Sequence, residues 1–201
     1  GFVERDVIGN CLVDMYVKCG WLSEAQKVFD KLSVRDTISW NTMMAGYAQF
    51  SESGTIFLVF DTMLGEGMKP DLVTFLLVLN ACSRTCLYKK SQTYLEAMSK
   101  VYGMIPAQEH HSCMINLLGR IGQLEKAMKK IAKLSHPNLS TWHALLGACR
   151  NWGNTNFGLK AFQYAVNLER SGTWHQIYAG SHFQAILGKG GEKGMYKYLC
   201  E

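Results

Sequence analysis

Proline is scarce in this sequence, and long apolar runs are missing from it. Only three of the 201 residues are proline, so little interrupts helix formation, and the many helix-forming residues favour an all-helical fold. The longest apolar runs, such as residues 75–79, are far shorter than the roughly 20 residues of a membrane-spanning helix. With 48% hydrophobic and 18% charged residues, the composition is typical of folded soluble proteins. We expect no membrane partner.

The sequence also lacks the spacings that bind metals. Seven cysteines and six histidines are present, but there is no Cys-x-x-Cys and no His-x-Glu. Cys11 and Cys113 share one register of a repeat along the chain, and Cys82 and Cys149 share another, which favours reduced thiols packed in a core. A nucleophile–base pair and a phosphate-binding glycine loop are missing too. We therefore predict no metal site, no cofactor and no catalytic residue.

The charge is only mildly positive. A formal net charge of +5 is a weak bias toward anionic partners. Lysines gather at residues 89–90, 126–133 and 189–193. For any one of these clusters, a solvated helix face is the simpler interpretation.

Residues 37–71 form the clearest structural unit. Apolar residues recur mostly every three or four positions in its first half, which predicts one apolar face of a helix; they are Ile38, Trp40, Met43, Met44 and Tyr47. After a break at residues 51–54 a second stripe begins, made of Ile56, Val59, Phe60 and Met63. The string Gly-Met-Lys-Pro-Asp at residues 67–71 then ends the pair. Such a hairpin cannot bury both faces alone, so we expect it to stack on similar units.

The same hairpin recurs along the chain with a variable period. One marker on each first helix is spaced 31, 35, 36 and 31 residues apart: Gly9, Trp40, Phe75, His111 and Trp142. A second marker, an apolar pair on each second helix, keeps the same register: Phe29 with Leu32, Phe60 with Met63, Leu95 with Met98, and Ile131 with Leu134. Unrelated amphipathic helices would not keep both markers together. In the first unit, this pattern also places Leu12, Met15 and Tyr16 on the apolar face.

Units of these lengths, and the strings within them, resemble the plant PLS-class pentatricopeptide repeat proteins of the E subgroup. The matching strings are LVDMYVKCG at residues 12–20, SWNTMMAGYAQ at 39–49, VLNACS at 78–83, MINLLGRIG at 114–122 and WHALLGACR at 142–150. The resemblance implies a right-handed α-solenoid of tandem helix-turn-helix repeats. A tetratricopeptide array, the obvious rival, would keep one 34-residue period.

The resemblance also implies a division of the chain. We expect the tail of a preceding repeat at residues 1–5, a short repeat at 6–36 (repeat 1), a standard repeat at 37–71 (repeat 2), a long repeat at 72–107 (repeat 3), a short repeat at 108–138 (repeat 4), an E-type motif at 139–172 and a divergent tail at 173–201. The tail at residues 1–5 suggests a C-terminal piece of a longer array.

The sequence departs from the family in three places. The glycine between the two helices, present as Gly20 and Gly122, is replaced by Ser51 in repeat 2 and Cys86 in repeat 3. If this turn needs a positive φ, both repeats carry a modest strain. Residues 173–201 keep only fragments of the second E motif. The DYW deaminase found in many relatives is not recognisable, because its His-x-Glu and Cys-x-x-Cys zinc signature is missing.

In this family the fifth and last residues of each repeat read one RNA base, and the second residue stacks on it. The resemblance therefore implies two reading pairs of the kind that prefers uracil, Asn10 with Asp36 and Asn41 with Asp71. Ser112 with Asn138 in repeat 4 resembles the adenine-preferring pair. The implied footprint is U, U or C, any base, then A, from 5′ to 3′.

The remaining positions of this register are less informative. Repeat 3 offers Leu76 with Ala107, which have little hydrogen-bonding capacity. The stacking candidates are Val7, Ile38 and Val73, whereas Glu109 and Ser140 in the later units are poor stackers. His143 occupies the reading position of the E-type motif.

Each of these residues has a simpler explanation. The asparagines could cap the first turn of a helix, and the aspartates could be N-caps of the helices that come after them. Recurrence of the same pair in two repeats favours base reading, although both roles can coexist in the aspartates. His110 and His111 are interpreted as packing on the first helix of repeat 4 rather than as a catalytic pair.

By this resemblance the chain binds single-stranded RNA as a specificity factor for C-to-U editing in a plant chloroplast or mitochondrion. The implied partners are editing factors of the MORF type and a DYW-type deaminase acting in trans. Two alternatives stay open: a factor for RNA splicing or stability, and a protein-interaction scaffold that does not bind RNA.

Overall fold

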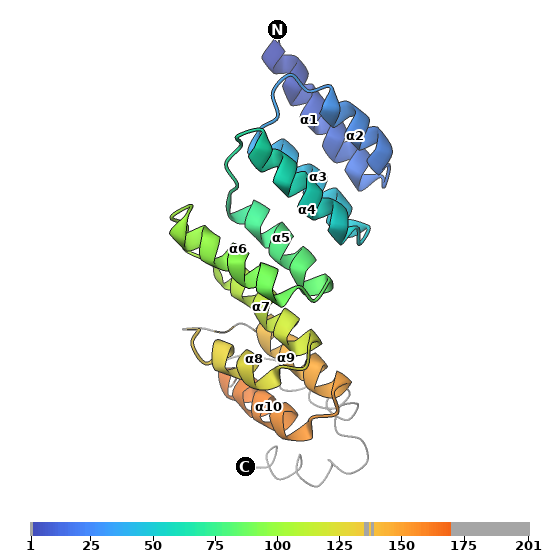
Figure 1. The fold of residues 1–201 in the computed structure, drawn as a ribbon. Helices are drawn as coiled ribbons and strands as arrows, with labels where there is room; N and C mark the ends of the chain where they lie inside the picture. The colour runs from blue at the N-terminus through green and yellow to red at the C-terminus, as the bar shows by residue number, and fades with distance from the viewer. Residues whose placement is uncertain (1, 135–136, 138, 170–201) are drawn as a thin grey trace. The chain divides into compact units, whose positions relative to one another are not determined.

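The computed structural model of the protein describes residues 2–134, 137 and 139–169 (Figure 1). In these residues the chain forms ten α-helices and no strand, which confirms the all-α repeat fold. The helices are α1 Phe2–Lys18, α2 Leu22–Asp30, α3 Thr37–Gln49, α4 Ser53–Gly65, α5 Leu72–Arg84, α6 Tyr88–Lys100, α7 Gln108–Arg120, α8 Leu124–Ile131, α9 Leu139–Asn151 and α10 Thr155–Glu169. None of the helices in these ranges has the length and apolar character needed to cross a membrane.

Two compact parts divide the chain, the N-terminal part at residues 1–113 and the C-terminal part at residues 114–201. In the N-terminal part each odd-numbered helix pairs with the next helix: α1 with α2, α3 with α4, and α5 with α6 (Figure 1). The first helices also pack on one another, α1 on α3 and α3 on α5. Short connections between antiparallel helices give this stacking of hairpins.

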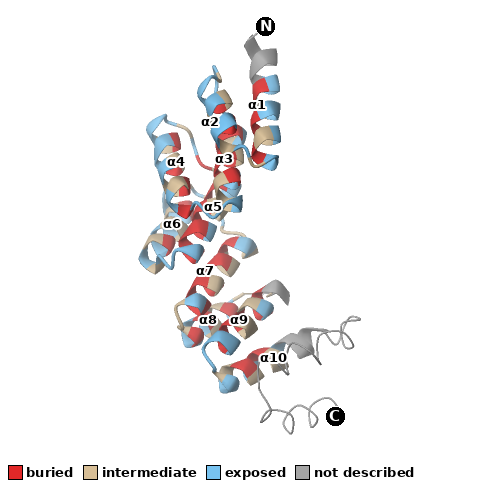
Figure 2. Ribbon diagram, turned by 90° about the vertical axis from the view of Figure 1, so that its right-hand side faces the viewer, coloured by how far each residue is buried: buried red, intermediate tan, exposed pale blue. Residues whose placement is uncertain are grey.

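The core of the N-terminal part follows the helical period. Each helix has a buried face that turns toward its neighbours (Figure 2). In α3, Trp40, Met43 and Met44 are buried, as their spacing predicts, but Ile38 is 69% exposed and does not belong to the core. Ile38 lies in the first turn of α3, where its side chain extends beyond the packed face.

The prediction for the apolar face of α1 is wrong in detail. Leu12 and Met15 are 39% and 43% exposed, while Val13 and Val17 are buried instead. Leu12 occupies the same repeat position as Met43, which is buried in α3.

Helix α1 starts at Phe2 and continues unbroken past residue 6. Asp36 and Asp71 precede α3 and α5 in extended backbone and cap them, whereas Arg5, at the same register, has no side-chain oxygen to begin a new helix. The helices α3, α5, α7 and α9 begin at residues 37, 72, 108 and 139. The tail at residues 173–201 lies outside the described residues.

Every first helix ends in the same turn. A backbone N–H three positions after the last residue of the helix donates to a carbonyl five residues earlier, at 2.9 to 3.0 Å; the donors are Trp21, Glu52, Leu87, Gln123 and Asn154. The residue before each of these donors has a positive φ, which is the Schellman ending. Ser51 and Cys86, at φ of 64° and 58°, adopt this conformation without being glycine. The strain expected in repeats 2 and 3 is therefore present.

The glycines at this turn also allow a close approach. A side-chain carbon built on Gly20 would lie 3.1 Å from Phe50 Cζ, and one built on Gly122 would lie 3.0 Å from the Trp152 ring. In both cases an aromatic ring of the next hairpin covers the turn. Trp152 also donates its indole N–H to the carbonyl of Gly119 at 2.9 Å.

One arginine joins repeats 1 and 2. Arg35 donates to the carbonyls of Phe29 at 3.2 Å and Asp30 at 3.0 Å at the end of α2. Its other nitrogen bonds Glu66 at 2.8 Å, just after α4. The guanidinium also lies over the Phe29 ring, 5.3 Å from its centre.

In the C-terminal part α8, α9 and α10 pack on one another. Trp142 of α9 stacks on Tyr164 of α10 with ring centres 5.4 Å apart and planes 5° apart. The side-chain Oδ1 of Asn154 accepts the backbone N–H of Phe157 at 3.1 Å and thereby caps α10.

The shared turn gives a prediction about two glycines of the N-terminal part. Gly20→Ala should lower the free energy of unfolding by about 1–2 kcal/mol, because alanine disfavours a positive φ and would crowd Phe50. Gly54→Ala, inside α4 with open space around the added carbon, should raise it by up to about 1 kcal/mol. Urea denaturation of both variants measures the difference. Equal effects of the same sign would contradict the account of this turn.

Candidate RNA-binding interface

Repeat 2 brings its two predicted reading residues into direct contact. Asn41 lies in the second turn of α3, and Asp71 immediately precedes α5. The Asn41 amide nitrogen donates to Asp71 Oδ1 at 3.0 Å, although the residues are 30 positions apart. Asn41 is only 9% exposed, so this amide is held rather than free to rotate.

A third residue, Thr74, completes this network. Its hydroxyl lies 2.7 Å from Asn41 Oδ1 and 2.9 Å from Asp71 Oδ1, and it donates its single proton to one of these oxygens at a time. The hydroxyl oxygen accepts the Asp71 backbone N–H at 3.1 Å, and Asp71 Oδ1 accepts the Thr74 backbone N–H at 2.8 Å. Asp71 and Thr74 therefore form a capping box. The Asn41 side chain is hydrogen-bonded to the side chains of both residues.

This network fixes which way the Asn41 amide points. An ionised carboxylate can only accept, so the amide NH₂ must face Asp71 and the amide oxygen must face Thr74. One proton of the NH₂ and one lone pair of the oxygen stay available. Asn41 thus presents a donor and an acceptor in a defined order, as recognition of a base edge requires.

Repeat 1 repeats the arrangement with a serine in place of the threonine. The Ser39 hydroxyl lies 2.8 Å from Asn10 Oδ1 and 2.6 Å from Asp36 Oδ1. Asp36 also accepts the Ser39 backbone N–H at 2.8 Å and so caps α3. The second reading pair, Asn10 with Asp36, is joined through this hydroxyl.

The two aspartates therefore have both of the roles that the sequence left open. Each caps the first helix of the next repeat, and each is bonded, directly or through a hydroxyl, to the asparagine of its own repeat. Burial raises the pKa of Asp71, but hydrogen bonds from the Thr74 backbone, the Asn41 amide, the Thr74 hydroxyl and the Val73 backbone outweigh it. The net result is a pKa below the ordinary 3.8, so Asp71 is ionised at neutral pH.

The three stacking candidates are exposed apolar side chains on first helices. Val7, Ile38 and Val73 are 59%, 69% and 51% exposed. Each lies three residues before the fifth position of its repeat, so each shares a helix face with Asn10, Asn41 or Leu76.

Repeat 3 has no amide–carboxylate pair. Leu76 is half-buried and packs against the core, and Ala107 has no hydrogen-bonding side chain. His110 lies at the register of Ser39 and Thr74, and its Nδ1 accepts the Ala107 backbone N–H at 3.2 Å. Its Nε2 is therefore the protonated nitrogen and donates to the Leu72 carbonyl at 2.9 Å. His110 is 2% exposed, as its packing interpretation predicts.

The later reading positions are only partly described. Ser112 donates to the Gln108 carbonyl at 3.0 Å, and its predicted partner Asn138 lies outside the described residues. Thr141, three residues after Asn138, is fully buried. Glu109 and His143 are exposed.

Sequence reasoning missed Ser39, Thr74 and His110. The signal for the first two was present, since Asp-x-x-Ser and Asp-x-x-Thr begin α3 and α5, and a hydroxyl three residues after an aspartate is typical of a capping box. His110 had no such signal, because its role depends on the carbonyl of Leu72, 38 residues away.

The thiols in this region are not set up as nucleophiles. Burial raises the pKa of Cys82 to about 11 and that of Cys113 to about 12, so both are protonated at neutral pH. In the described ranges, histidines, cysteines and acidic residues do not gather in groups of three or more that would hold a metal ion.

The capping network gives a prediction about Asp71. Asp71→Ala should lower the free energy of unfolding by about 0.5–2 kcal/mol, because it removes the acceptor of the Thr74 backbone N–H and of the Asn41 amide. Asp71→Asn keeps a capping oxygen and should retain more of this stability at neutral pH.

The pH dependence separates the charge of Asp71 from its cap. Because the folded pKa lies below 3.8, the ionised carboxylate stabilises the fold above that pH, and this contribution is lost as the pH falls through the folded pKa. The advantage of the wild type over Asp71→Asn, measured by urea denaturation, should be constant between about pH 7 and 5 and should shrink below about pH 4. An advantage that stayed constant down to about pH 3 would contradict this assignment.

Known protein families match this chain along much of its length. A model described as the PPR repeat family matches residues 35–84, and one described as the PPR repeat matches residues 10–36 and 109–133. A pentatricopeptide repeat-containing protein of Arabidopsis thaliana is 39% identical over 170 residues, covering 84% of this chain and 23% of the relative. A second one from that plant, named as mitochondrial, is 40% identical over 181 residues, covering 87% of this chain and 29% of the relative. The chain thus spans about a quarter of the length of these relatives.

The fold agrees with solved structures of the same repeats. The pentatricopeptide repeat protein PPR10 from maize superimposes with a TM-score of 0.63 at 24% identity, covering 82% of this chain and 25% of PPR10. PPR10 in complex with an 18-nt psaJ RNA element gives a TM-score of 0.66 at 23% identity over the same shares. Sequence and fold together show that this chain belongs to the pentatricopeptide repeat family.

Proposed function

We propose that the chain binds single-stranded RNA and that each reading pair selects one base. The observation that carries this proposal is the Asn41–Asp71–Thr74 network, which holds a nearly buried amide in one orientation and leaves it one donor and one acceptor. Its recurrence as Asn10–Asp36–Ser39 supports a role beyond capping, since a cap needs no asparagine. The chain's family and the solved complex of PPR10 with RNA support the same ligand.

The chemistry suits uracil at these two positions. The Watson–Crick edge of uracil offers carbonyl acceptors beside an N–H donor, which the amide of Asn10 or Asn41 complements with its free N–H and its oxygen. In this scheme neither aspartate touches the base: Asp71 holds the Asn41 amide directly, and Asp36 is linked to Asn10 through the Ser39 hydroxyl. Val7, Ile38 and Val73 cover the base faces, since exposed apolar side chains beside the reading residues offer stacking surfaces.

The later units extend the footprint. Repeat 3 accepts any base, because Leu76 and Ala107 have no polar side-chain group with which to choose. Ser112 with Asn138 selects adenine in repeat 4. The proposed sequence is therefore U, U or C, any base, then A, from 5′ to 3′.

The biological role is the finer part of the proposal. As a member of this family the chain serves as a site-recognition factor for C-to-U editing of RNA in a plant chloroplast or mitochondrion, and one similar relative is mitochondrial. A DYW-type deaminase protein acts in trans through the E-type motif at residues 139–172. MORF-type factors bind at the long repeat.

Binding to short RNAs tests the reading pairs. The chain should bind an RNA that contains UUNA more tightly than the same RNA with either U replaced by G, by about fivefold or more for each replacement, since one base contact contributes roughly 1–3 kcal/mol. Asn41→Ala should remove the preference at the second position only, because Asn10 still reads the first. Fluorescence anisotropy at fixed salt measures both affinities.

Asn80→Ala is the matched control for this experiment. Asn80 lies on α5, another first helix, and is exposed, but it is not at a reading register. This variant should keep the full preference for U. Equal binding of the U and G forms by the wild type, or the same loss in Asn80→Ala, would contradict the proposed code.

A further inference from the structure

Positive charge is distributed very unevenly between the two parts of the chain. Residues 1–113, which contain both asparagine–aspartate pairs, have ten basic and twelve acidic residues. Residues 114–201 have eleven basic and four acidic residues. The formal charge of the chain therefore comes from a C-terminal part at +7 and an N-terminal part at −2. Electrostatic attraction for a polyanion must come mainly from the C-terminal part.

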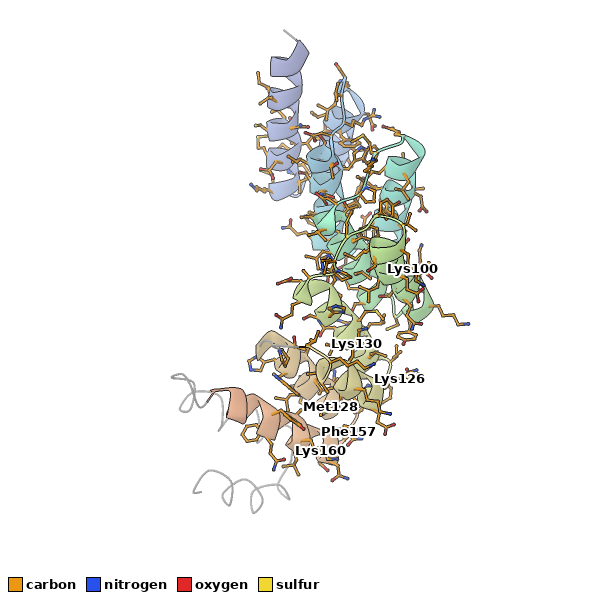
Figure 3. The ribbon with its side chains drawn as sticks, turned by 90° about the vertical axis from the view of Figure 1, so that its left-hand side faces the viewer. Lys100, Lys126, Met128, Lys130, Phe157 and Lys160 are labelled. Atoms are coloured by element: carbon orange, nitrogen blue, oxygen red, sulfur yellow. The ribbon has the colours of Figure 1, made fainter. Side chains whose placement is uncertain are left out.

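Much of this charge lies on one surface of α8 and α10. Helix α8 buries Leu124, Ala127 and Ile131 and turns its lysines outward. We define the lysine face as five residues: Lys126, Lys129 and Lys130 of α8, Lys133 in the turn after α8, and Lys160 of α10. The two helices are in contact, and Figure 3 shows the labelled Lys126, Lys130 and Lys160 in the same region of the C-terminal part.

The macrodipole of α8 explains this cluster only in part. Lysines near a helix C-terminus interact favourably with its negative end. Lys130, however, is half-buried, and its pKa is lowered first by burial and then by the charge of Lys133. Within the described ranges no ion pair joins Lys129, Lys130, Lys133 or Lys160 to a carboxylate. By contrast, Lys18, Lys27 and Lys100 of the N-terminal part each pair with a carboxylate three or four residues away, at 2.6 to 2.8 Å. The charges of Lys130 and Lys133 thus repel each other, and a bound anion would relieve that repulsion.

The composition of the face favours a nucleic acid over other anions. Lys126 and Lys130 lie about one turn apart on α8, roughly 6 Å along its axis, and Lys133 follows in the turn directly after the helix. Phe157 lies half-buried beside Lys160, whose ammonium is 6.0 Å from the ring centre, and an aromatic ring next to cations suits stacked bases. The described residues of α8 include no exposed large hydrophobic side chain of the kind that enters a lipid surface.

We propose that the lysine face binds the phosphate backbone of the RNA, without regard to its base sequence. This inference rests on the proposed RNA-binding function and adds a division of labour to it. The asparagine–aspartate pairs of the N-terminal part choose bases, and the lysine face supplies most of the salt-dependent affinity. Lysine suits this task, because an ammonium is a compact point charge that binds phosphate without selecting a base.

Two variants of equal charge test this assignment in the full chain. One replaces Lys129, Lys130, Lys133 and Lys160 of the lysine face with glutamine. The other replaces Lys27, Lys31, Lys89 and Lys100, which are exposed lysines on or beside α2 and α6, with glutamine. Circular dichroism checks that both variants are folded. Affinity for a UUNA-containing RNA is then measured as a function of salt concentration.

The two variants should differ in salt dependence but not in base preference. For single strands the slope of log K against log salt is about −0.7 for each phosphate contact, so loss of the lysine face should make it shallower by up to about 2.8. The control variant should keep nearly the wild-type slope, and both should keep the wild-type preference for U over G. An unchanged slope in the lysine-face variant, or equal changes in both, would overturn the inference.

Further outcomes separate this inference from the proposed function. The wild type could show no preference for U while the two variants still differ in salt slope. That result would overturn base reading by the asparagines and would support phosphate binding by the lysine face. The wild type could also bind poly-glutamate, or vesicles containing phosphatidylserine, as tightly as it binds RNA. If this binding is lost in the lysine-face variant, RNA is not the specific ligand of the lysine face. Absence of any RNA binding would overturn both proposals.

Discussion

A hydrogen-bonded aspartate at the junction between two repeats links the fold to the candidate site. Asp71 accepts the Thr74 backbone N–H in the first turn of α5 and also the side-chain amide of Asn41 from the preceding helix pair. The same carboxylate oxygen therefore begins one helix hairpin and orients the polar group of another. Asp36 has the equivalent position before α3. A displaced junction would both uncap a helix and release the Asn41 amide, so in our proposal stability and base recognition depend on the same contact.

Repeat 3 shows how the fold responds when this contact is replaced. Ala107 cannot cap a helix with its side chain, and His110 accepts the Ala107 backbone N–H as the Thr74 hydroxyl accepts that of Asp71. The junction survives, but no carboxylate is left to hold an amide at the position of Leu76. Hairpin stacking therefore tolerates several chemistries at the junction, whereas base reading in our proposal needs the aspartate. The exposed Ser51 and Cys86 turns show similar tolerance, since both keep the positive φ usually left to glycine.

Much of this structure could be predicted from sequence, because repetition reveals register. The spacing of Trp40, Phe75 and their equivalents located the hairpins, and the recurring asparagine and aspartate identified residues that the structure brings together in repeats 1 and 2. Details that depend on neighbours were not predictable in this way. Leu12 occupies the same repeat position as the buried Met43, yet Leu12 itself is exposed. The hydroxyls of Ser39 and Thr74 escaped notice because their importance lies in a contact about 30 residues back along the chain.

The central claim is that Asp71 acts on the RNA through Asn41. A double-mutant cycle tests it most directly, using Asn41→Ala, Asp71→Ala and the double variant, with the ratio of affinities for U-containing and G-containing RNA as the readout. If the carboxylate only positions the amide, the double variant should lose no more discrimination than Asn41→Ala alone, which makes the two effects strongly non-additive. Independent, additive losses would contradict the account, because Asp71 would then contact the base or act elsewhere.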